Sequence, residues 1–273
     1  MATIHPTAVV SKDAIIGEGV SIGAFVVIEG RVVIGDGCDI QAGARLMGPL
    51  TLGKRNVVYG GATLGGWPQD RKYTGEPSET IIGDDNMFRE AVTIHRGTGM
   101  NTRTIIGNRN YFMVGAHVGH NCVVHNDITM VNYSSLGGHV TVFDKAIIGA
   151  SSAVHQFARV GRLAMTSAGA GVGQDLPPFA LTMVTNRFNQ LNVIGLRRSG
   201  AARENINAVR KTFQFLFRTN RGRPLKNAIA ELPEALLAHD LAREFVDFCK
   251  GPTKRGIARF EPWSSSRTSA AGD

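Results

Sequence analysis

Aliphatic residues recur at every sixth position through the first part of the chain. The series starts at Ile4 and ends at Val160, and of its 27 positions only Asp70 and Glu76 are not apolar. A period of six matches neither the 3.6-residue period of an α-helix nor the two-residue period of a half-buried strand. It indicates a short strand and a corner, repeated so that one side chain of each repeat points into a shared core.

Three such strands per coil give an 18-residue turn, which is typical of a hexapeptide-repeat parallel β-helix. The 33 glycines fit this pattern, because many directly follow the apolar position, where a corner or a close backbone approach favours glycine. We therefore predict an all-β solenoid over residues 1–185. Residues 66–80 are polar and contain proline and glycine, so we expect an external loop there, and a smaller excursion at 96–104.

The last third of the chain has a helical pattern. Its apolar residues recur mainly at steps of three and four, at Ile206, Val209, Phe213, Leu216 and Phe217. A further helix is expected at about 241–248, and residues 186–263 are predicted to form a C-terminal α-helical domain. Residues 264–273 are small and polar, and are predicted to be a disordered tail.

The net charge of +8 is confined to this last third. Residues 1–185 carry 14 basic and 14 acidic side chains, whereas residues 186–273 carry 16 basic and 8 acidic ones. A localised basic surface predicts an acidic partner. The cations of this region could alternatively form a nucleic-acid surface or a solvated face, but we favour docking of an acidic protein.

The composition predicts a cytoplasmic protein. No apolar run is long enough to span a membrane, and the first residues, MATIHPTAVV, lack the pattern of a secretory signal. Cys38, Cys122 and Cys249 are widely spaced, as expected of free thiols in a reducing compartment. We expect no bound cofactor and no resident metal.

Histidines are concentrated in the second half of the solenoid, where six of the eight lie between residues 95 and 155. Moving on from His120 by one coil and then by a second reaches positions 138 and 156, and His139 and His155 are the immediate neighbours of these positions. His117 belongs to the same coil as His120. The spacing predicts an imidazole cluster along one edge of the solenoid, suited to acid–base chemistry near neutral pH.

Local motifs extend this interpretation. The chain resembles the UDP-N-acetylglucosamine 3-O-acyltransferases, which begin lipid A synthesis in Gram-negative bacteria. The segments that carry the resemblance are WPQDRKYTGEP (67–77), VTIHRGT (92–98), AHVGHNC (116–122), LGGHV (136–140), AVHQF (153–157), GQDLPP (173–178) and NVIGLRRSG (192–200). The resemblance implies a left-handed β-helix, a homotrimer with active sites between subunits, and transfer of a (3R)-3-hydroxyacyl group from acyl carrier protein.

The resemblance also assigns roles to individual residues. His120 would be the general base for the sugar 3-hydroxyl, and the backbone N–H of Gly138 would stabilise the oxyanion. The substrate would be positioned by Asp70, Lys72, His117, His139, His155 and Gln156, and its nucleotide end by Asn192 and Arg198. Ala168 would end the acyl channel. A basic face formed by Arg197, Arg203, Arg210 and Lys211 would dock the carrier protein.

Three departures from the family pattern leave alternatives open. Asn121 stands where Asp often follows the catalytic histidine, Ile194 where an acidic residue is common, and Ser199 where a second arginine is common. A modified aminosugar is therefore an alternative acceptor, and the acyl length is not determined. A coenzyme A-dependent sugar acetyltransferase and a zinc-dependent γ-type carbonic anhydrase, which would use His120 and His125, are the rival functions.

Overall fold

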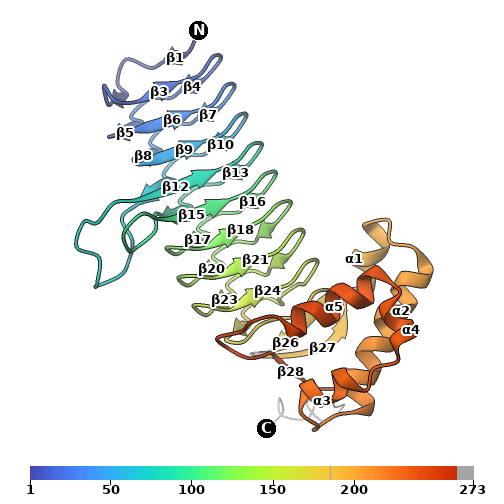
Figure 1. Cartoon of the computed structure of the whole chain (residues 1–273). Coiled ribbons are helices and arrows are strands. Elements are labelled where there is room, and N and C mark those ends of the chain that lie inside the picture. Colours follow the sequence, from blue (N-terminus) through green and yellow to red (C-terminus); the bar gives the residue numbers. More distant parts are fainter. Residues whose placement is uncertain (185, 263–273) are drawn as a thin grey trace, which may run out of the picture.

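The computed structural model describes residues 1–184 and 186–262, and consists of a long prism followed by a smaller, mostly helical part (Figure 1). Three parallel sheets form the faces of the prism. The first contains β1 (Thr3–Ile4), β4 (Ser21–Ile22), β7 (Asp39–Ile40), β10 (Val57–Val58), β13 (Met87–Phe88), β16 (Tyr111–Phe112), β19 (Thr129–Met130) and β22 (Ile147–Ile148). The second contains β2 (Val9–Val10), β5 (Val27–Glu29), β8 (Arg45–Met47), β11 (Thr63–Gly66), β14 (Thr93–His95), β17 (His117–Val118), β20 (Ser135–Leu136), β23 (Ala153–Val154) and β25 (Gly171–Val172). The third contains β3 (Ile15–Ile16), β6 (Val32–Ile34), β9 (Leu50–Leu52), β12 (Ser78–Ile82), β15 (Thr102–Ile106), β18 (Val123–Val124), β21 (Thr141–Val142) and β24 (Arg159–Val160).

The strand register confirms the predicted length of the coil. Thr3 pairs with Ser21, and His117 pairs with Ser135. The two predicted excursions lengthen the coils that contain them, so that Met87 of β13 pairs with Val57 of β10 on one side and with Tyr111 of β16 on the other. The strands on either side of each insertion still pair in parallel, and the register between β11 and β14 shifts between Leu64 and Gly66, where the first insertion leaves the prism.

The first insertion projects between β11 and β12. The residues at the two ends of the expected 66–80 loop belong to these strands. The second lies between β14 and β15. Met100 falls in this second excursion and is 65 % exposed, so its apolar character at the six-residue spacing does not mark a core position. The remaining apolar positions of the series from Ile22 onward are buried. Ile4 is 45 % exposed because it belongs to the first coil, where a further coil does not cover it.

The corner after β17, β20 and β23 bends through a left-handed backbone conformation. The residues concerned are Asn121 (φ 60°), His139 (φ 60°) and Phe157 (φ 67°). Asparagine adopts this region readily, whereas for phenylalanine it is strained and must be held by the surrounding coil. These residues form one column along the edge, and the preceding column consists of His120, Gly138 and Gln156.

The C-terminal part contains strands as well as the predicted helices. An antiparallel pair, β26 (Ala180–Val184) and β27 (Arg187–Leu191), is extended by β28 (Arg259–Phe260), so the boundary drawn between residues 185 and 186 falls within this pair. The helices are α1 (Val193–Arg198), α2 (Arg203–Phe213), the π-helix η1 (Gln214–Thr219), α3 (Leu225–Ala230), α4 (Glu234–Leu237) and α5 (Asp240–Lys250). The predicted apolar stripe of α2 and η1 is buried, and α5 contains the second predicted helix.

Two arginines at the end of the prism attach the helical part to it, one through a backbone hydrogen bond and one through an ion pair. Arg159 bonds to the fully buried carboxylate of Asp175 and to the carbonyl of Phe248 in α5, and Arg162 pairs with Glu244 at the same helix. Within the described ranges, no helix has the length and apolar character needed to cross a membrane. The predicted tail at 264–273 lies outside the described residues.

Candidate active site

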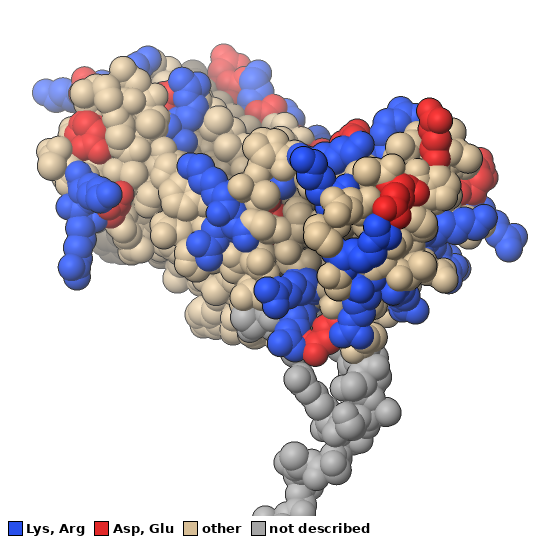
Figure 2. Space-filling model, turned by 60° about the horizontal axis from the view of Figure 1, so that its bottom comes forward, with Lys and Arg blue, Asp and Glu red and all other residues tan. Residues whose placement is uncertain are grey.

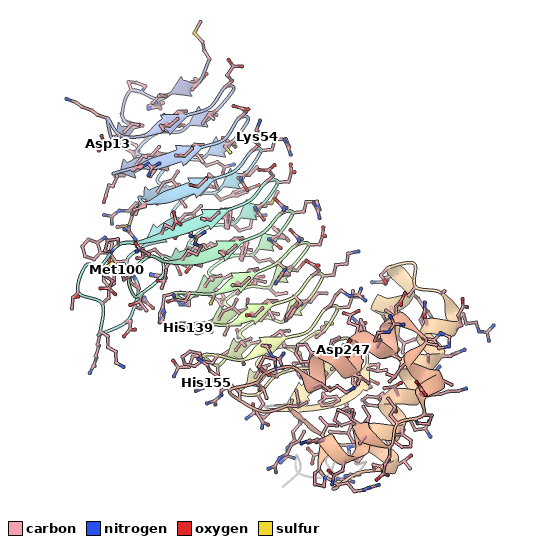
Figure 3. The ribbon with its side chains drawn as sticks, in the orientation of Figure 1. Asp13, Lys54, Met100, His139, His155 and Asp247 are labelled. Carbon is pink, nitrogen blue, oxygen red and sulfur yellow. The ribbon has the colours of Figure 1, made fainter. Side chains whose placement is uncertain are left out.

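The predicted histidine cluster forms on one edge of the prism, below the two excursions. His139 and His155 stand on this edge, on the side where the loop with Met100 projects (Figure 3). The ring of His120 meets the ring of His139 edge-on at a centroid distance of 5.2 Å. The regular coil thus brings together three histidines from positions 120, 139 and 155, as the spacing predicts.

The Asn121 side chain sets the orientation of His120. His120 Nδ1 lies 2.8 Å from Asn121 Oδ1. This oxygen also accepts the Thr98 N–H at 2.9 Å, while Asn121 Nδ2 donates to the Thr98 carbonyl at 3.3 Å. The two bonds to Thr98 identify the oxygen end of the amide, so Nδ1 must donate and Nε2 keeps its lone pair. This is the tautomer that a general base at Nε2 requires.

Gly138 lies against the imidazole of His120. A Cβ atom added at Gly138 would come within 2.6 Å of His120 Nε2, so only glycine fits beside the ring in its present position. The Gly138 N–H has no acceptor among the described residues, although Gly137 N–H and His139 N–H on either side are both bonded. The backbone of Gly138, whose N–H has no acceptor among the described residues, therefore lies against the ring that would act as base.

His139 is part of a stack that supports His120. Its ring stacks on the Phe157 ring with a centroid distance of 4.6 Å. Lys254 Nζ in turn lies 4.4 Å from the centroid of the Phe157 ring. Burial lowers the pKa of His139, and the nearby His120 and Lys254 add to this effect, whereas Asp70 opposes it. Through Lys254, the C-terminal part of the chain contacts the edge that carries the histidines. No sequence motif indicates this contact.

His117 and His95 lie deeper, with ring centroids 5.1 Å apart. His117 Nδ1 bonds to Thr93 Oγ1 at 2.9 Å, and burial, followed by the effect of His95, lowers the pKa of His117 to about 4. Burial likewise lowers the pKa of His95, whose Nδ1 lies 2.5 Å from the Trp67 carbonyl oxygen. Both rings are therefore neutral at pH 7 and act as hydrogen-bonding groups.

A cavity of about 440 Å³ opens along this edge. Its lining consists of Gln69, His117, Gly119, His120, Ser135, Leu136, Gly137, Gly138, Ala153, Val154, His155 and Gln156. The predicted residues His117, His120, Gly138, His155 and Gln156 are thus brought together. His139 is not part of this lining, but its ring contacts the ring of His120.

The other predicted substrate residues lie outside this lining. On the external loop, Lys72 is exposed, and its N–H donates to the Asp70 carboxylate at 3.0 Å. Arg198 is exposed at the end of α1. The Asn192 amide caps α1 by accepting the Gly195 N–H at 2.8 Å, and it donates to the Leu163 carbonyl at 3.0 Å. Asn192 therefore shapes the start of α1.

Ala168, the predicted end of the acyl channel, is exposed at a corner beside Gly169. The four predicted docking cations are exposed on α1 and α2, and none pairs with a carboxylate in the described ranges. The face that includes the C-terminal elements carries many lysine and arginine side chains with few acidic ones among them (Figure 2). A second basic region, absent from the sequence-based prediction, surrounds a groove of about 1150 Å³ whose rim includes Arg221, Lys226, Lys250 and Arg259.

Several site residues escape sequence reasoning. Gln69 lies in the WPQDRKYTGEP motif, but the resemblance assigns it no role. The spacing does not place His95 with the other histidines, because the second excursion interrupts the regular coil after it. Lys254 is remote from Phe157 in sequence, and only the folded chain joins them. The burial of His95 also shows that a histidine off the inward phase can be enclosed by a loop.

His125, the second histidine of the carbonic anhydrase alternative, belongs to a different face. It follows β18, stacks on Phe143 at 5.0 Å, and is absent from the cavity lining. In the part of the chain that the structure describes, there is no cluster of three or more histidine, cysteine or acidic side chains arranged to hold a metal ion.

Comparisons with protein families match both parts of the chain. Residues 13–48 match the bacterial transferase hexapeptide family, and residues 175–258 match the second domain of UDP-N-acetylglucosamine O-acyltransferases. A curated relative from Stenotrophomonas maltophilia, an acyl-[acyl-carrier-protein]–UDP-N-acetylglucosamine O-acyltransferase, is 43% identical over 248 residues. The alignment covers 90% of this chain and 94% of the relative.

Solved structures give the same result. The UDP-N-acetylglucosamine acyltransferase of Francisella novicida superposes with a TM-score of 0.88 at 34% identity, covering 99% of both chains. The enzyme of Bacteroides fragilis has a TM-score of 0.88 at 35% identity, covering 94% of this chain and 100% of its own. The fold is therefore the expected left-handed β-helix with a C-terminal helical region.

Proposed function

This chain belongs to the UDP-N-acetylglucosamine O-acyltransferase family, and we propose that it transfers its acyl group with His120 as the general base. Like its relatives, it is an acyl-[acyl-carrier-protein]–UDP-N-acetylglucosamine O-acyltransferase. The donor is a (3R)-3-hydroxyacyl thioester, the acceptor is the sugar 3-hydroxyl, and the product enters lipid A synthesis. The reaction takes place in the cytoplasm, where the three free thiols would stay reduced.

The hydrogen bond from His120 Nδ1–H to Asn121 Oδ1 carries this proposal. A sugar hydroxyl is a poor nucleophile, so a base must accept its proton as it attacks the thioester carbon. The Asn121 oxygen holds the tautomer whose Nε2 can accept that proton. The imidazolium that results returns the proton to the departing thiolate, which leaves His120 ready for another turnover.

The free N–H of Gly138 would act on the same carbonyl. When the sugar oxygen attacks, the thioester oxygen gains negative charge, and a fixed N–H donor stabilises that charge. Gly138 precedes His139 in the chain, and its backbone lies against the His120 ring. The base and the oxyanion donor are therefore adjacent, as an acyl transfer needs.

The direct experiment is to incubate the purified protein with UDP-N-acetylglucosamine and a series of (3R)-3-hydroxyacyl carrier thioesters, and to measure the acylated sugar nucleotide. We expect 3-O-acylation, because the cavity joins an activated base to an oxyanion donor. Acylation of a UDP-linked aminosugar variant in preference to UDP-N-acetylglucosamine would instead support the modified acceptor. Light scattering on the same sample tests the homotrimer, whose neighbouring subunits would close the open side of the cavity.

The donor preference separates this function from coenzyme A-dependent acetyl transfer. Carrier proteins are acidic, and the unpaired cations of α1 and α2 should increase their rate of encounter. We expect a much higher kcat/KM with the carrier thioester than with the matching coenzyme A thioester at low salt. The advantage should shrink near 1 M salt, where the Debye length falls to about 3 Å.

Charge reversal locates this docking surface. Replacing Arg210 and Lys211 by Glu should reduce the advantage of the carrier thioester, since both side chains are exposed on α2. The matched variant replaces Arg221 and Lys226, at the rim of the 1150 Å³ groove, by Glu. If only the second variant lost the advantage of the carrier thioester, the docking surface would lie at the groove instead. Equal use of both donors by the parent protein would favour the acetyltransferase alternative.

The acyl length is expected to depend on Ala168. By the resemblance to the family, Ala168 falls where glycine in some members leaves room for a longer acyl chain, and the methyl group of alanine would project into that channel. We therefore expect Ala168→Gly to shift the preferred donor towards longer acyl chains. Competition between donors of different length measures the shift, and an unchanged length profile would place the end of the channel elsewhere.

A further inference from the structure

The external loop ends in a carboxylate that faces the second excursion. One Glu76 oxygen accepts the Gly99 N–H at 2.8 Å and the Thr98 hydroxyl at 3.3 Å, and the other accepts the Thr74 N–H at 2.9 Å. Backbone N–H groups, with Thr74 first and Gly99 next, lower the pKa of Glu76 to about 2. Glu76 is thus an ionised acceptor near neutral pH, and it ties the two excursions together.

Thr98, held in this way, contacts the amide of Asn121 at both ends. Its N–H donates to Oδ1 and its carbonyl accepts from Nδ2. An asparagine amide has a donor at one end and an acceptor at the other, so a single residue whose N–H and carbonyl bond to both ends permits one orientation only. The backbone N–H of Asn121 is fixed separately, by a 2.8 Å bond to Thr104 Oγ1.

This orientation decides whether His120 can act as a base. While the oxygen of Asn121 faces His120 Nδ1, the histidine proton stays on Nδ1 and Nε2 is free. If the amide turned over, its NH₂ group would face Nδ1, and the proton would move to Nε2. A histidine with Nε2 protonated cannot accept the sugar proton from the cavity.

We propose that Glu76 is a positioning residue for His120, acting through Thr98, Gly99 and the Asn121 amide to hold the catalytic tautomer. The inference rests on the proposed role of His120 as general base. It also gives a reason for asparagine at position 121. An aspartate there would place a second acceptor opposite the Thr98 carbonyl, whereas the asparagine Nδ2 donates to it.

The first test compares Glu76→Gln with Glu79→Gln. Glu79 lies on the neighbouring strand β12, and its carboxylate pairs only with Arg103, at 3.5 Å, among the described residues. We expect Glu76→Gln to lower kcat about tenfold, the scale of losing a hydrogen bond to a charged group, with KM for the sugar nucleotide little changed. Glu79→Gln should keep the parent kcat. An equal loss in both variants would overturn the proposal.

A double-variant cycle tests whether Glu76 acts through Asn121. Asn121→Gly removes the amide and suits the left-handed backbone at φ 60°. If the two residues form one chain of contacts, the double variant should be no slower than Asn121→Gly alone. Losses that multiply would show that Glu76 acts by another route. Circular dichroism on each variant checks that the fold is retained.

A readout that does not need turnover follows the tautomer itself. Nitrogen NMR of protein labelled with ¹⁵N-histidine distinguishes protonated from unprotonated ring nitrogens, and the His120 signals are assigned by their loss in His120→Ala. We expect an unprotonated Nε2 in the parent protein and a mixture of tautomers in Glu76→Gln. An unchanged tautomer would overturn the inference, whereas absent acyl transfer with the expected tautomers would count against the proposed function alone.

Discussion

His120→Ala should lower kcat by at least about a hundredfold, because proton transfer to a general base typically contributes roughly 10²–10⁴-fold to the rate of an enzymatic reaction. The lost group is the imidazole Nε2 that would accept the proton of the sugar hydroxyl. The fold should be retained, since His120 lies at a corner of the prism and outside the buried aliphatic column. Steady-state acyl transfer and circular dichroism measure the two effects.

The matched control is His125→Ala, which removes an imidazole from another face. His125 stacks on Phe143 and is not part of the cavity lining, so its removal should leave kcat within about twofold of the parent value. Near-normal turnover by His120→Ala would contradict the proposed base. Zinc-dependent hydration of carbon dioxide by the parent protein that is lost in His125→Ala would instead favour the carbonic anhydrase alternative.

The largest stability effect is expected from Val142→Asp. Val142 is fully buried in β21 and packs in the aliphatic column of the prism. The carboxylate of an aspartate there would be buried without a cation or a hydrogen-bond donor. Because each coil is buried only by its neighbours, the adjacent coils would be destabilised as well. We expect a loss of more than about 4 kcal/mol in the free energy of unfolding, which is exceptional for one substitution.

Thr141→Asp provides the comparison on the same strand. Thr141 is adjacent to Val142, so its side chain points to the opposite, outer side and is only half-buried. Its substitution should lower the free energy of unfolding by less than about 1 kcal/mol, because substitutions at surface positions usually have small effects. Urea denaturation of both variants measures the difference. Equal stability of the two would mean that the six-residue series does not mark the core.

The solenoid and its histidine edge could be predicted from the sequence because both depend on local spacing. Outside the two insertions, each coil repeats the same three strands, so position alone predicts the inward residue of each repeat between Ile22 and Val160. The same spacing placed His120, His139 and His155 on one edge. Family motifs then indicated the chemistry, which the relatives and the superposed structures confirm as O-acyl transfer.

Insertions into the coil hid other features. The external loop and the second excursion lengthen the coils on either side of β13, and so remove the alignment on which position-based reasoning depends. Met100 lies at a position of the six-residue series and yet is exposed. His95 lies outside that series and yet is buried, with a hydrogen bond to the Trp67 carbonyl. Burial at these places is decided by how each excursion folds back on the prism.

The sequence alone predicts the β-helix, the inward phase of its core and the edge that carries the imidazoles, because all three depend on spacing within each coil. The tautomer and the contacts of those imidazoles depend instead on segments that meet only in the folded chain. Asn121 is oriented by Thr98 of the second excursion, and Lys254 reaches the Phe157 ring from the far end of the chain. Hydrogen bonds and stacking depend on distances of a few ångströms between segments that are remote in sequence, and a repeat does not encode those distances.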